Sequence, residues 1–350
     1  MTPLTSHYIT LKHRYIVCIL VYVGDLMTFV QDVLAEGGII KPLLIDPNDL
    51  IGPSITNPSV LVRDGKILMN LRNVNYTLFH AEKHRFQHFW GALCYIHPEN
   101  DNHLRTNNFI AELDDNLDIK WYSEIDSSEF DNYTPCWDFV GLEDIRLVEW
   151  DGKLYGLGVR RDLDEVGTGR MEAIELDIQG TTVKEVSRYR IPGPPPDKEY
   201  CMKNCVPILD KPNHLLKWCN PTALMKYAPG EETEVFDTSG FYEGIDPHLR
   251  GGSQVIPYKD GYLTLIHETH MNTTERGMKD ADYLHRFIYW DKNFQNMRQS
   301  KLFSFIGLRI EFCCGLAEYG DHFLITFGGT DNAGYIVKAS KELVESYIDE

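Results

Sequence analysis

Short apolar runs that alternate with polar residues recur along the chain, and a tight turn separates each pair of runs. The clearest pair surrounds Asp151-Gly152, where residues 141–161 read GLEDIRLVEWDGKLYGLGVRR. An Asp-Gly step between two strand-like runs is a strong signal for a β-hairpin, because both central residues of a type I′ turn need positive φ. The sequence therefore predicts two antiparallel strands that meet at this turn.

Polar side chains gather at the open end of this predicted hairpin. They are Glu143, Asp144 and Arg146 at the start of the first strand, and Arg160, Arg161 and Asp162 at the end of the second. Because the hairpin folds back on itself, we expect the two groups to lie next to each other. A carboxylate pair beside guanidinium groups is more typical of a functional site than of a solvated face.

Four further hairpins show the same arrangement, with turns near residues 64, 211, 260 and 320 and polar residues at each open end. Any β-rich protein has hairpins, but that alone does not explain the repeated polar ends. Repeats of this kind are typical of β-propeller blades. We therefore expect an all-β fold, a five-bladed β-propeller over residues 36–350 with a short C-terminal helix at 341–350. Residues 1–35 are expected to form an N-terminal extension with some helix.

The charge of the chain narrows the classes of partner. The sequence carries 52 acidic and 34 basic residues, a net charge of −18, and its pI is near 5.1. Binding to nucleic-acid backbones or to anionic membranes needs basic surface, so we expect neither a nucleic acid nor a membrane as partner. A local basic pocket at the hairpin ends is compatible with this charge.

Cysteine and histidine spacings give no sign of a metal site. The eight cysteines lack metal-site spacing, and in a chain of this length we expect buried thiols in a reducing, cytoplasmic compartment. HETH at 267–270 is not a zinc motif, because its histidines are three residues apart on a predicted strand and the helical motif needs four. We therefore expect no metal and no cofactor.

Several motifs together resemble one known family. GLEDIRL is similar to the Gly-x-Glu-Asp-x-Arg motif of glycoside hydrolase family 130 (GH130), five-bladed propeller enzymes that include β-mannoside phosphorylases, hydrolases and related β-mannosyltransferases. The likeness continues in order along the chain with NPS at 57–59, GRME at 169–172, KN at 203–204, RGGS at 250–253, HE at 267–268 and GGTDNA at 328–333. It covers roughly residues 40–340. Ile145 stands where members usually carry proline, which indicates a divergent subgroup.

The resemblance implies that Asp144 is the catalytic acid and that it relays a proton through a hydroxyl of the bound sugar. Glycosyl transfer needs a proton on the leaving oxygen and a nucleophile on the opposite face of the sugar. Glu143 is expected to act beside Asp144, and Arg146 to orient it and bind substrate; both would tune its pKa. The alternative for these three residues is a structural salt-bridge network between blades.

The nucleophile decides the class of reaction. Inorganic phosphate needs several cations, with arginine favoured for its two-pronged geometry. The candidates are Arg161, Arg170, Lys203 and His267. Hydrolases of the family instead place glutamates there to activate water, and Glu268 and Glu172 are available as alternative general bases. The number of cations favours phosphate, or a phosphorylated donor such as a sugar nucleotide, although each cation has an inter-blade ion pair as its alternative.

Amides and charged groups at other hairpin ends are expected to bind sugar hydroxyls, because each can engage two adjacent hydroxyls. They are Asn57, Asn70 and Arg72 on the first hairpin, and Asp331 after the last. Tyr76, Trp137 or Tyr335 could stack on a sugar ring, with core packing as the simpler expectation for each.

Three functions remain open. The first is a glycoside phosphorylase or glycosyltransferase that moves a β-mannosyl or similar unit, with phosphate, a sugar phosphate or a nucleotide sugar as co-substrate. The second is an inverting β-mannoside hydrolase. The third is a non-catalytic carbohydrate-binding propeller. An oligosaccharide or glycoside is the expected partner in each, and the sequence does not indicate the oligomeric state.

Overall fold

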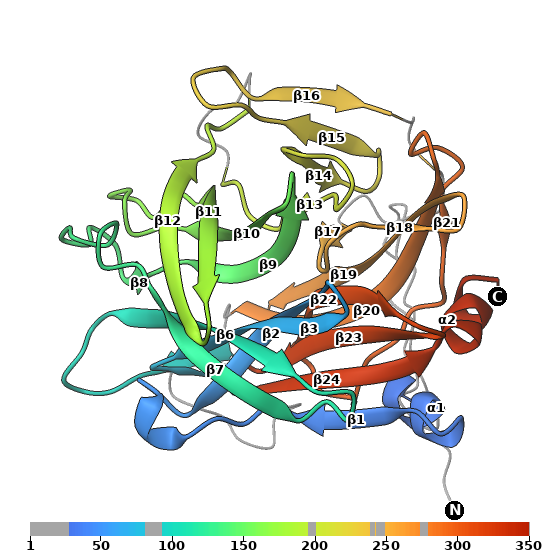
Figure 1. Ribbon diagram of the computed structural model, residues 1–350, viewed down its shortest axis with the longest axis horizontal. Helices are drawn as coiled ribbons and strands as arrows, with labels where there is room; N and C mark the ends of the chain where they lie inside the picture. The colour runs from blue at the N-terminus through green and yellow to red at the C-terminus, as the bar shows by residue number, and fades with distance from the viewer. Residues whose placement is uncertain are drawn as a thin grey trace, which may run out of the picture.

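Antiparallel sheets arranged around a common centre make up the protein (Figure 1). The computed structural model describes residues 28–80, 93–194, 201–238, 242, 249–273 and 279–349. The sheets follow one another around the centre in chain order, which confirms the predicted all-β propeller fold. In the described part of the chain, no helix is long and apolar enough to cross a membrane.

The first meander of strands contains the first predicted hairpin. Its strands are β2 (Ser54–Arg63), β3 (Lys66–Val74), β6 (Leu104–Leu113) and β7 (Ile119–Asp126). Asp64 and Gly65 form the turn between β2 and β3 with φ of 50° and 73°, and this pair of positive φ angles is what the type I′ prediction required. Between β3 and β6, the short strands β4 (Thr77–His80) and β5 (Leu93–Ile96) pair with each other.

The second meander contains the hairpin with the carboxylate pair. Its strands are β9 (Glu143–Trp150), β10 (Lys153–Arg160), β11 (Arg170–Gln179) and β12 (Thr182–Arg190). Its outer strand β12 pairs in parallel with β7, so the two meanders and the short β8 (Phe139–Val140) form one nine-stranded sheet. Because two of the expected blades are joined in this way, the count of five blades stays a prediction.

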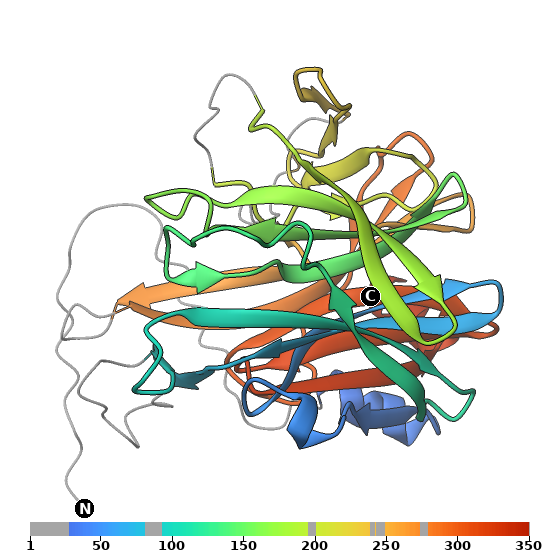
Figure 2. The same cartoon turned by 60° about the vertical axis from the view of Figure 1, so that its left-hand side comes forward.

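The third and fourth sheets continue around the centre. The third consists of β13 (Val206–Pro207), β14 (His214–Trp218), β15 (Ala223–Lys226) and β16 (Glu234–Asp237). The fourth consists of β17 (Arg250–Gly251), β18 (Ile256–Tyr258), β19 (Gly261–Thr273), β20 (Lys279–Asp291) and β21 (Arg298–Gln299). The β19–β20 hairpin projects beyond the other sheets on one side of the molecule (Figure 2).

The last sheet joins the two ends of the described chain. It consists of β22 (Glu311–Tyr319), β23 (His322–Gly329), β24 (Ala333–Ser340) and β1 (Ile39–Pro42). The early strand β1 pairs with the last strand β24, so this sheet closes the ring of sheets. The predicted C-terminal helix is confirmed as α2 (Lys341–Asp349), and a 3-10 turn, η1 (Pro47–Asp49), follows β1.

A short helix, α1 (Phe29–Ala35), stands before β1. A capping box starts it, in which Thr28 and Gln31 satisfy each other's backbone N–H groups. Phe29 is fully buried and its ring stacks on Phe303 with centroids 4.9 Å apart. Residues 1–27 lie outside the described residues, and the division at residue 36 into an extension and a propeller stays a prediction.

A buried amide links the inner strands of several sheets. The Gln254 side chain donates from Nε2 to the carbonyl of Val60 at 2.7 Å and to that of Leu147 at 2.9 Å. Its oxygen accepts from the backbone N–H of Leu316 at 3.2 Å. Since these partners lie on β2, β9 and β22, one side chain fixes three inner strands relative to one another.

Only some of the described cysteines are buried. Cys205, Cys219, Cys313 and Cys314 are buried free thiols, as expected, but Cys136 and Cys201 are exposed. The expectation of buried thiols is wrong for these two, because both stand in irregular segments outside the strands.

Candidate active site

One cavity of about 150 Å³ is lined by residues of the nine-stranded, fourth and last sheets, of the β4–β5 pair and of the segment that precedes β13. Of the thirteen side chains named as site candidates from the sequence, eight line it. They are Asn57, Arg72, Glu143, Asp144, Arg161, Lys203, His267 and Asp331. The open ends of the hairpins therefore meet in space, although the chain separates the first and last of these residues by 274 positions.

Four of the lining residues have left-handed backbone conformations. The φ angles are 42° at Asn57, 53° at Asp144, 60° at Asn204 and 47° at Asp331. Outside glycine this region is sparsely populated, and Asn and Asp tolerate it best because their short side chains can hydrogen-bond locally. Such conformations cluster at functional sites, where the surrounding structure supports the strain.

A bulge in β9 places Asp144. Glu143 is paired with Val159 and Arg146 with Leu157, so Asp144 and Ile145 together oppose the single residue Gly158. A bulge of this kind turns a side chain away from its normal alternation. Gly158 is required there, because a Cβ atom would lie 2.6 Å from the carbonyl oxygen of Glu143.

Arg72 bridges the two neighbouring carboxylates. Its Nη1 donates to Asp144 Oδ1 at 2.7 Å, and its Nη2 lies 3.3 Å from Glu143 Oε2 and 2.8 Å from the Tyr76 hydroxyl. The guanidinium is buried, with 2% of the side chain exposed. Asn57 completes the arrangement by donating from Nδ2 to Asp144 at 2.9 Å and to Asp331 at 3.4 Å.

The environment separates the pKa values of the three carboxyl groups. Burial raises the pKa of Glu143 to about 7, although the charge of Arg72 opposes the shift. Burial also acts on Asp144, but Arg72, Arg146 and the hydrogen bond from Asn57 outweigh it and hold the pKa of Asp144 below its usual value. Burial raises the pKa of Asp331. Near neutral pH the site therefore contains an ionised Asp144 beside a Glu143 that can carry a proton.

Two cations face the same cavity. Arg161 donates from Nε to the carbonyl of Gly167 at 3.0 Å, and its guanidinium lies 4.9 Å from the centroid of the Phe139 ring. Lys203 is exposed at the edge of the cavity. Neither forms a salt bridge with a carboxylate among the described residues, so both can receive an anion.

His267 lines the cavity as a neutral ring. Burial lowers its pKa well below the usual value, and the nearby His285 and Arg146 add to this effect. The ring stacks on Tyr283 with centroids 5.2 Å apart, and its buried Nδ1 has no hydrogen-bond partner among the described residues. His267 can therefore exchange a hydrogen bond with a ligand, but it does not supply the positive charge expected from the sequence.

Two of the predicted substrate-binding residues lie behind the cavity. Arg146 donates from Nε to the carbonyl of Gly252 at 2.9 Å and from Nη1 to the backbone carbonyl of Asp144 at 2.6 Å. Asn70 is fully buried and donates to the carbonyl of Phe109 at 3.3 Å. Arg146 therefore holds the Asp144 backbone from behind, and neither side chain lines the cavity.

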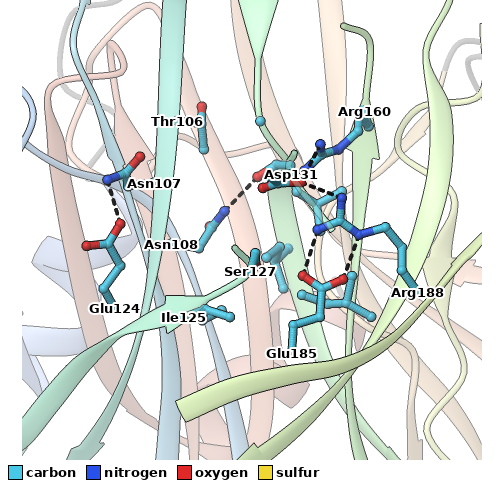
Figure 3. A pocket seen from close by; sticks show the side chains of 14 residues that line it. Thr106, Asn107, Asn108, Glu124, Ile125, Ser127, Asp131, Arg160, Glu185 and Arg188 are labelled. Atoms are coloured by element: carbon cyan, nitrogen blue, oxygen red, sulfur yellow. Dashed lines mark hydrogen bonds and ion pairs between the residues drawn. The ribbon is translucent and has the colours of Figure 1, made fainter. Parts of the chain in front are cut away.

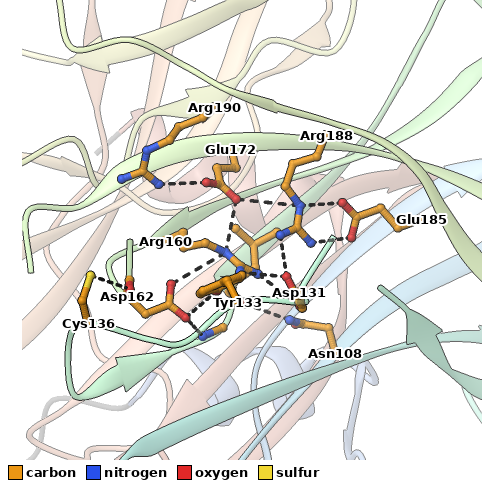
Figure 4. A network of polar contacts seen from close by, with 12 residues as sticks. Asn108, Asp131, Tyr133, Cys136, Arg160, Asp162, Glu172, Glu185, Arg188 and Arg190 are labelled. Atoms are coloured by element: carbon orange, nitrogen blue, oxygen red, sulfur yellow. Dashed lines mark hydrogen bonds and ion pairs between the residues drawn. The ribbon is translucent and has the colours of Figure 1, made fainter. Parts of the chain in front are cut away.

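Three other candidates also lie outside the lining. Glu172 is 1% exposed and forms ion pairs with Arg160 at 3.2 Å and Arg190 at 2.8 Å (Figure 4). Glu268 pairs with Arg286 and lies 3.4 Å from His270. Arg170 donates to the carbonyl of Gly169 at 3.0 Å. The expectation that either glutamate is a general base is not carried forward, because cations already engage both carboxylates.

Aromatic residues on one side of the cavity were not among the site residues named from the sequence. They include Tyr95 on β5, Phe139 on β8 and Tyr283 on β20. Tyr95 and Phe139 meet edge to face with centroids 5.4 Å apart. These strands do not belong to the five hairpins, so the hairpin pattern gave no signal for them. Tyr76, named as a candidate for stacking, lines the cavity through the same aromatic group.

A second, smaller cavity of about 70 Å³ lies between the first two meanders (Figure 3). Its charged groups pair with one another: Asp131 accepts from Arg160 at 2.8 Å and Arg188 at 2.5 Å, and Glu185 accepts from Arg188 at 2.6 Å. Both arginines of this cavity are thus engaged by carboxylates, and its third acid, Glu124, accepts from the Asn107 amide at 2.7 Å, so the cavity offers no unpaired cation to an anionic ligand. Across the described ranges, no group of three or more His, Cys, Asp and Glu side chains could hold a metal ion.

Comparison with known proteins identifies the fold. No family model and no curated protein matches the chain by sequence. Among solved structures, the β-1,2-mannobiose phosphorylase from Listeria innocua, in complex with β-1,2-mannobiose, is 13% identical, with a TM-score of 0.50 over 89% of this chain and 99% of that chain. The chain shares the fold of the GH130 enzymes.

Two further structures support this fold. One comes from work on the GH130 family of mannoside phosphorylases, which contains glycoside hydrolases that target β-1,2 mannosidic linkages in Candida mannan; it is 12% identical, with a TM-score of 0.53 over 83% of this chain and 85% of that chain. A glycosyl hydrolase from Bacteroides ovatus is 11% identical, with the same TM-score and coverage. The resemblance inferred from the motifs is thus confirmed at the level of the fold.

Proposed function

We propose that the chain is a carbohydrate-active enzyme that transfers a glycosyl unit, most simply a β-mannosyl unit, between an oligosaccharide and inorganic phosphate. One observation carries the proposal: a single cavity contains three carboxyl groups with separated pKa values and two cations that have no carboxylate partner among the described residues. The GH130 fold, with phosphorylases and hydrolases of mannosides among its members, is consistent with this choice of substrate.

In this proposal the acidic side of the cavity holds the sugar. Asp144, Asp331 and Asn57 form a connected set, since Asn57 donates to both carboxylates. A bound sugar would replace some of these internal hydrogen bonds with bonds from its hydroxyls, because a carboxylate can accept from two adjacent hydroxyls. Tyr95 and Phe139 would pack against the apolar face of a sugar ring.

The carboxyl pair would supply the proton as a unit. Glu143 can hold the proton near neutral pH, whereas Asp144 is ionised in the resting site. We assign to Glu143 the storage of the proton, and to Asp144 the orientation of the sugar hydroxyl through which the proton reaches the leaving oxygen. This division differs from the expectation that Asp144 itself holds the proton, because Arg72 lies 2.7 Å from Asp144 and 3.3 Å from Glu143.

Arg161 and Lys203 would bind the phosphate. In the transfer, a phosphate oxygen forms a bond to the anomeric carbon while the glycosidic bond breaks, and the leaving oxygen takes the proton. The products are a sugar 1-phosphate and a shortened oligosaccharide. Cations lower the repulsion between phosphate and the carboxylates of the site, and the neutral His267 would add a hydrogen bond.

The test is a panel of β-manno-oligosaccharides, including β-1,2-mannobiose, incubated with and without phosphate, together with the reverse reaction from mannose 1-phosphate. Transfer from GDP-mannose, which would release GDP, is measured separately. The proposal expects mannose 1-phosphate to form only when phosphate is present, and the Asp144→Asn variant to lose about 10² to 10⁴-fold in kcat. Sugar release at the same rate without phosphate would identify a hydrolase instead. Binding of the sugars without turnover, unchanged in Asp144→Asn, would identify a binding protein.

A further inference from the structure

A buried carboxylate next to the cavity links three segments of the chain. Asp162 follows β10 and none of its surface is exposed. Its Oδ2 accepts hydrogen bonds from the backbone N–H of Gly141 at 2.9 Å and from the Tyr133 hydroxyl at 2.8 Å (Figure 4). Its backbone carbonyl accepts from the N–H of Cys136 at 2.9 Å. The side chain itself does not line the cavity.

The bond to Gly141 closes the β9–β10 hairpin beyond the bulge. The register of the two strands changes between Leu157 and Val159, so the bulge interrupts their regular pairing beside Asp144. The N–H of Gly141, two residues before Glu143, then bonds to the side chain that follows the opposite strand. Glu143 and Asp144 are thereby held from both sides, by the regular pairing on one side and by Asp162 on the other.

The segment around Gly141 is also held by close packing against β6. Gly141 has φ of 103°, and a Cβ atom there would lie 2.6 Å from the carbonyl oxygen of Thr106 on β6. Close packing against β6 and the bond to Asp162 together determine where the strand that carries the carboxylates begins.

The same residue determines the course of the chain at Arg161. Arg161 stands between Arg160 and Asp162, and both neighbours are buried. Arg160 is held by Asp131 at 2.8 Å and Glu172 at 3.2 Å. Because its two neighbours point into this network, Arg161 extends to the opposite side, over Phe139 and into the cavity.

The position of Asp162 is costly for stability. Its Oδ1 has no hydrogen-bond partner among the described residues, and the nearest cationic nitrogen is Arg160 Nε at 4.0 Å. A buried carboxylate with an unsatisfied oxygen lowers stability. Features that cost stability in this way concentrate at sites where geometry serves function.

We propose that Asp162 is a positioning residue that sets the separation between the Glu143–Asp144 carboxyls and the Arg161 guanidinium. It thereby sets the distance between the proton donor and the phosphate. The role assigned to phosphate rests on the proposed function, whereas the positioning of the two groups rests on the hydrogen bonds described here. No atom of Asp162 takes part in the reaction.

The test compares Asp162→Ala and Asp162→Asn with Glu185→Gln as a matched control. Glu185 is a fully buried carboxylate of the same network and hydrogen-bonds Arg188 at 2.6 Å, but it bonds to neither Gly141 nor Arg161. Thermal unfolding and steady-state kinetics are measured for all three variants, well below their melting temperatures. We expect Asp162→Ala and Glu185→Gln to lose stability, because the first leaves the Gly141 and Tyr133 donors without an acceptor and the second leaves Arg188 without its buried counter-charge. Only Asp162→Ala should lose kcat, by about 100-fold, because small misplacements of reacting groups have effects of that size.

Further readouts separate positioning from a general loss of structure. Asp162→Asn retains an oxygen that can accept from Gly141, so it should recover much of the kcat that Asp162→Ala loses. Asp162→Ala should also raise the KM for phosphate and shift the alkaline limb of the pH profile, since Glu143 moves relative to Arg72. If Asp162→Ala keeps kcat, KM and pH profile while its stability falls as in Glu185→Gln, the positioning role is refuted and the proposed function stands.

Crystal structures of Asp162→Ala and Glu185→Gln decide the claim independently of any turnover. We expect Glu143 Oε2 to move out of hydrogen-bond reach of Arg72 in the first and to keep its place in the second. An unchanged carboxylate pair and an unchanged Arg161 in Asp162→Ala would overturn the inference. If the wild-type protein turns over no glycoside but the carboxylates move as expected, the proposed function fails and the positioning role remains.

Discussion

Glutamine in place of Glu143 should make the protein more stable at neutral and alkaline pH while it abolishes transfer. The Glu143 carboxyl keeps its proton up to about pH 7 in the folded protein, against an ordinary value of 4.5. Between these two pH values the folded state binds more protons at this position than the unfolded state does. Stability from this group is therefore complete below about pH 4.5 and falls as the pH rises to 7.

The rise in the pKa of Glu143 determines how much stability the wild type loses with increasing pH. At about 1.4 kcal/mol per pH unit, a rise from 4.5 to about 7 corresponds to a loss of about 3 kcal/mol in the free energy of unfolding. Glutamine has nearly the same shape and cannot ionise, so the Glu143→Gln variant avoids this loss. Relative to the wild type, the variant should gain about 3 kcal/mol of stability on going from pH 4.5 to pH 8.

Urea unfolding of both proteins at pH 4.5, 6 and 8 measures this difference. Asp144→Asn serves as a control of opposite sign, because the pKa of Asp144 is lowered and its charged form stabilises the fold. The stability that this variant loses relative to the wild type should already be complete at pH 4.5 and stay constant up to pH 8, because the contribution of Asp144 is lost only as the pH falls below about 4. Parallel stability curves for wild type and Glu143→Gln across this range would refute the assignment of the proton to Glu143.

Three further outcomes follow from the same geometry. Asp144→Asn should lower kcat by about 10² to 10⁴-fold with little change in sugar binding, as measured by initial rates and calorimetry; retained activity would contradict its role. Arg161→Met and Lys203→Met should each raise the KM for phosphate by about tenfold or more and leave the affinity for sugar unchanged, and equal effects on both ligands would argue against a phosphate subsite. Arg72→Met should lower the free energy of unfolding by about 3–5 kcal/mol at pH 8 and by less at pH 5, where Glu143 is protonated and needs no counter-charge; urea unfolding at the two pH values checks this.

Hairpins were the part of the fold that the sequence predicted best. The turns at Asp64-Gly65 and Asp151-Gly152 have the expected positive φ angles, because few residues other than Gly, Asn and Asp tolerate that conformation and so mark it in the sequence. The convergence of the hairpin ends was also predictable, since each polar cluster was visible in the sequence at the open end of its own hairpin.

Other features depend on contacts that the sequence does not show. The bulge at Asp144 depends on Gly158 of the opposite strand, and the same residue types would fit a regular pairing. The ion pairs of Glu172 with Arg190, and of Glu268 with Arg286, come from neighbouring strands whose register is not evident from short motifs. A buried glutamate that is paired therefore looked the same, in sequence, as a glutamate free to act as a base.

The parallel pairing of β7 with β12 joins the first two meanders into one hydrogen-bonded sheet. The pairing lies at the outer edge of both meanders. These two meanders carry Arg72, Glu143 and Asp144. His267 lies on β19 of the fourth sheet and Lys203 precedes the third, and a parallel bridge between Ile208 and Val255 joins these two sheets. A movement that separated Arg72 from the two carboxylates would therefore have to break the β7–β12 pairing as well as the contacts inside the cavity.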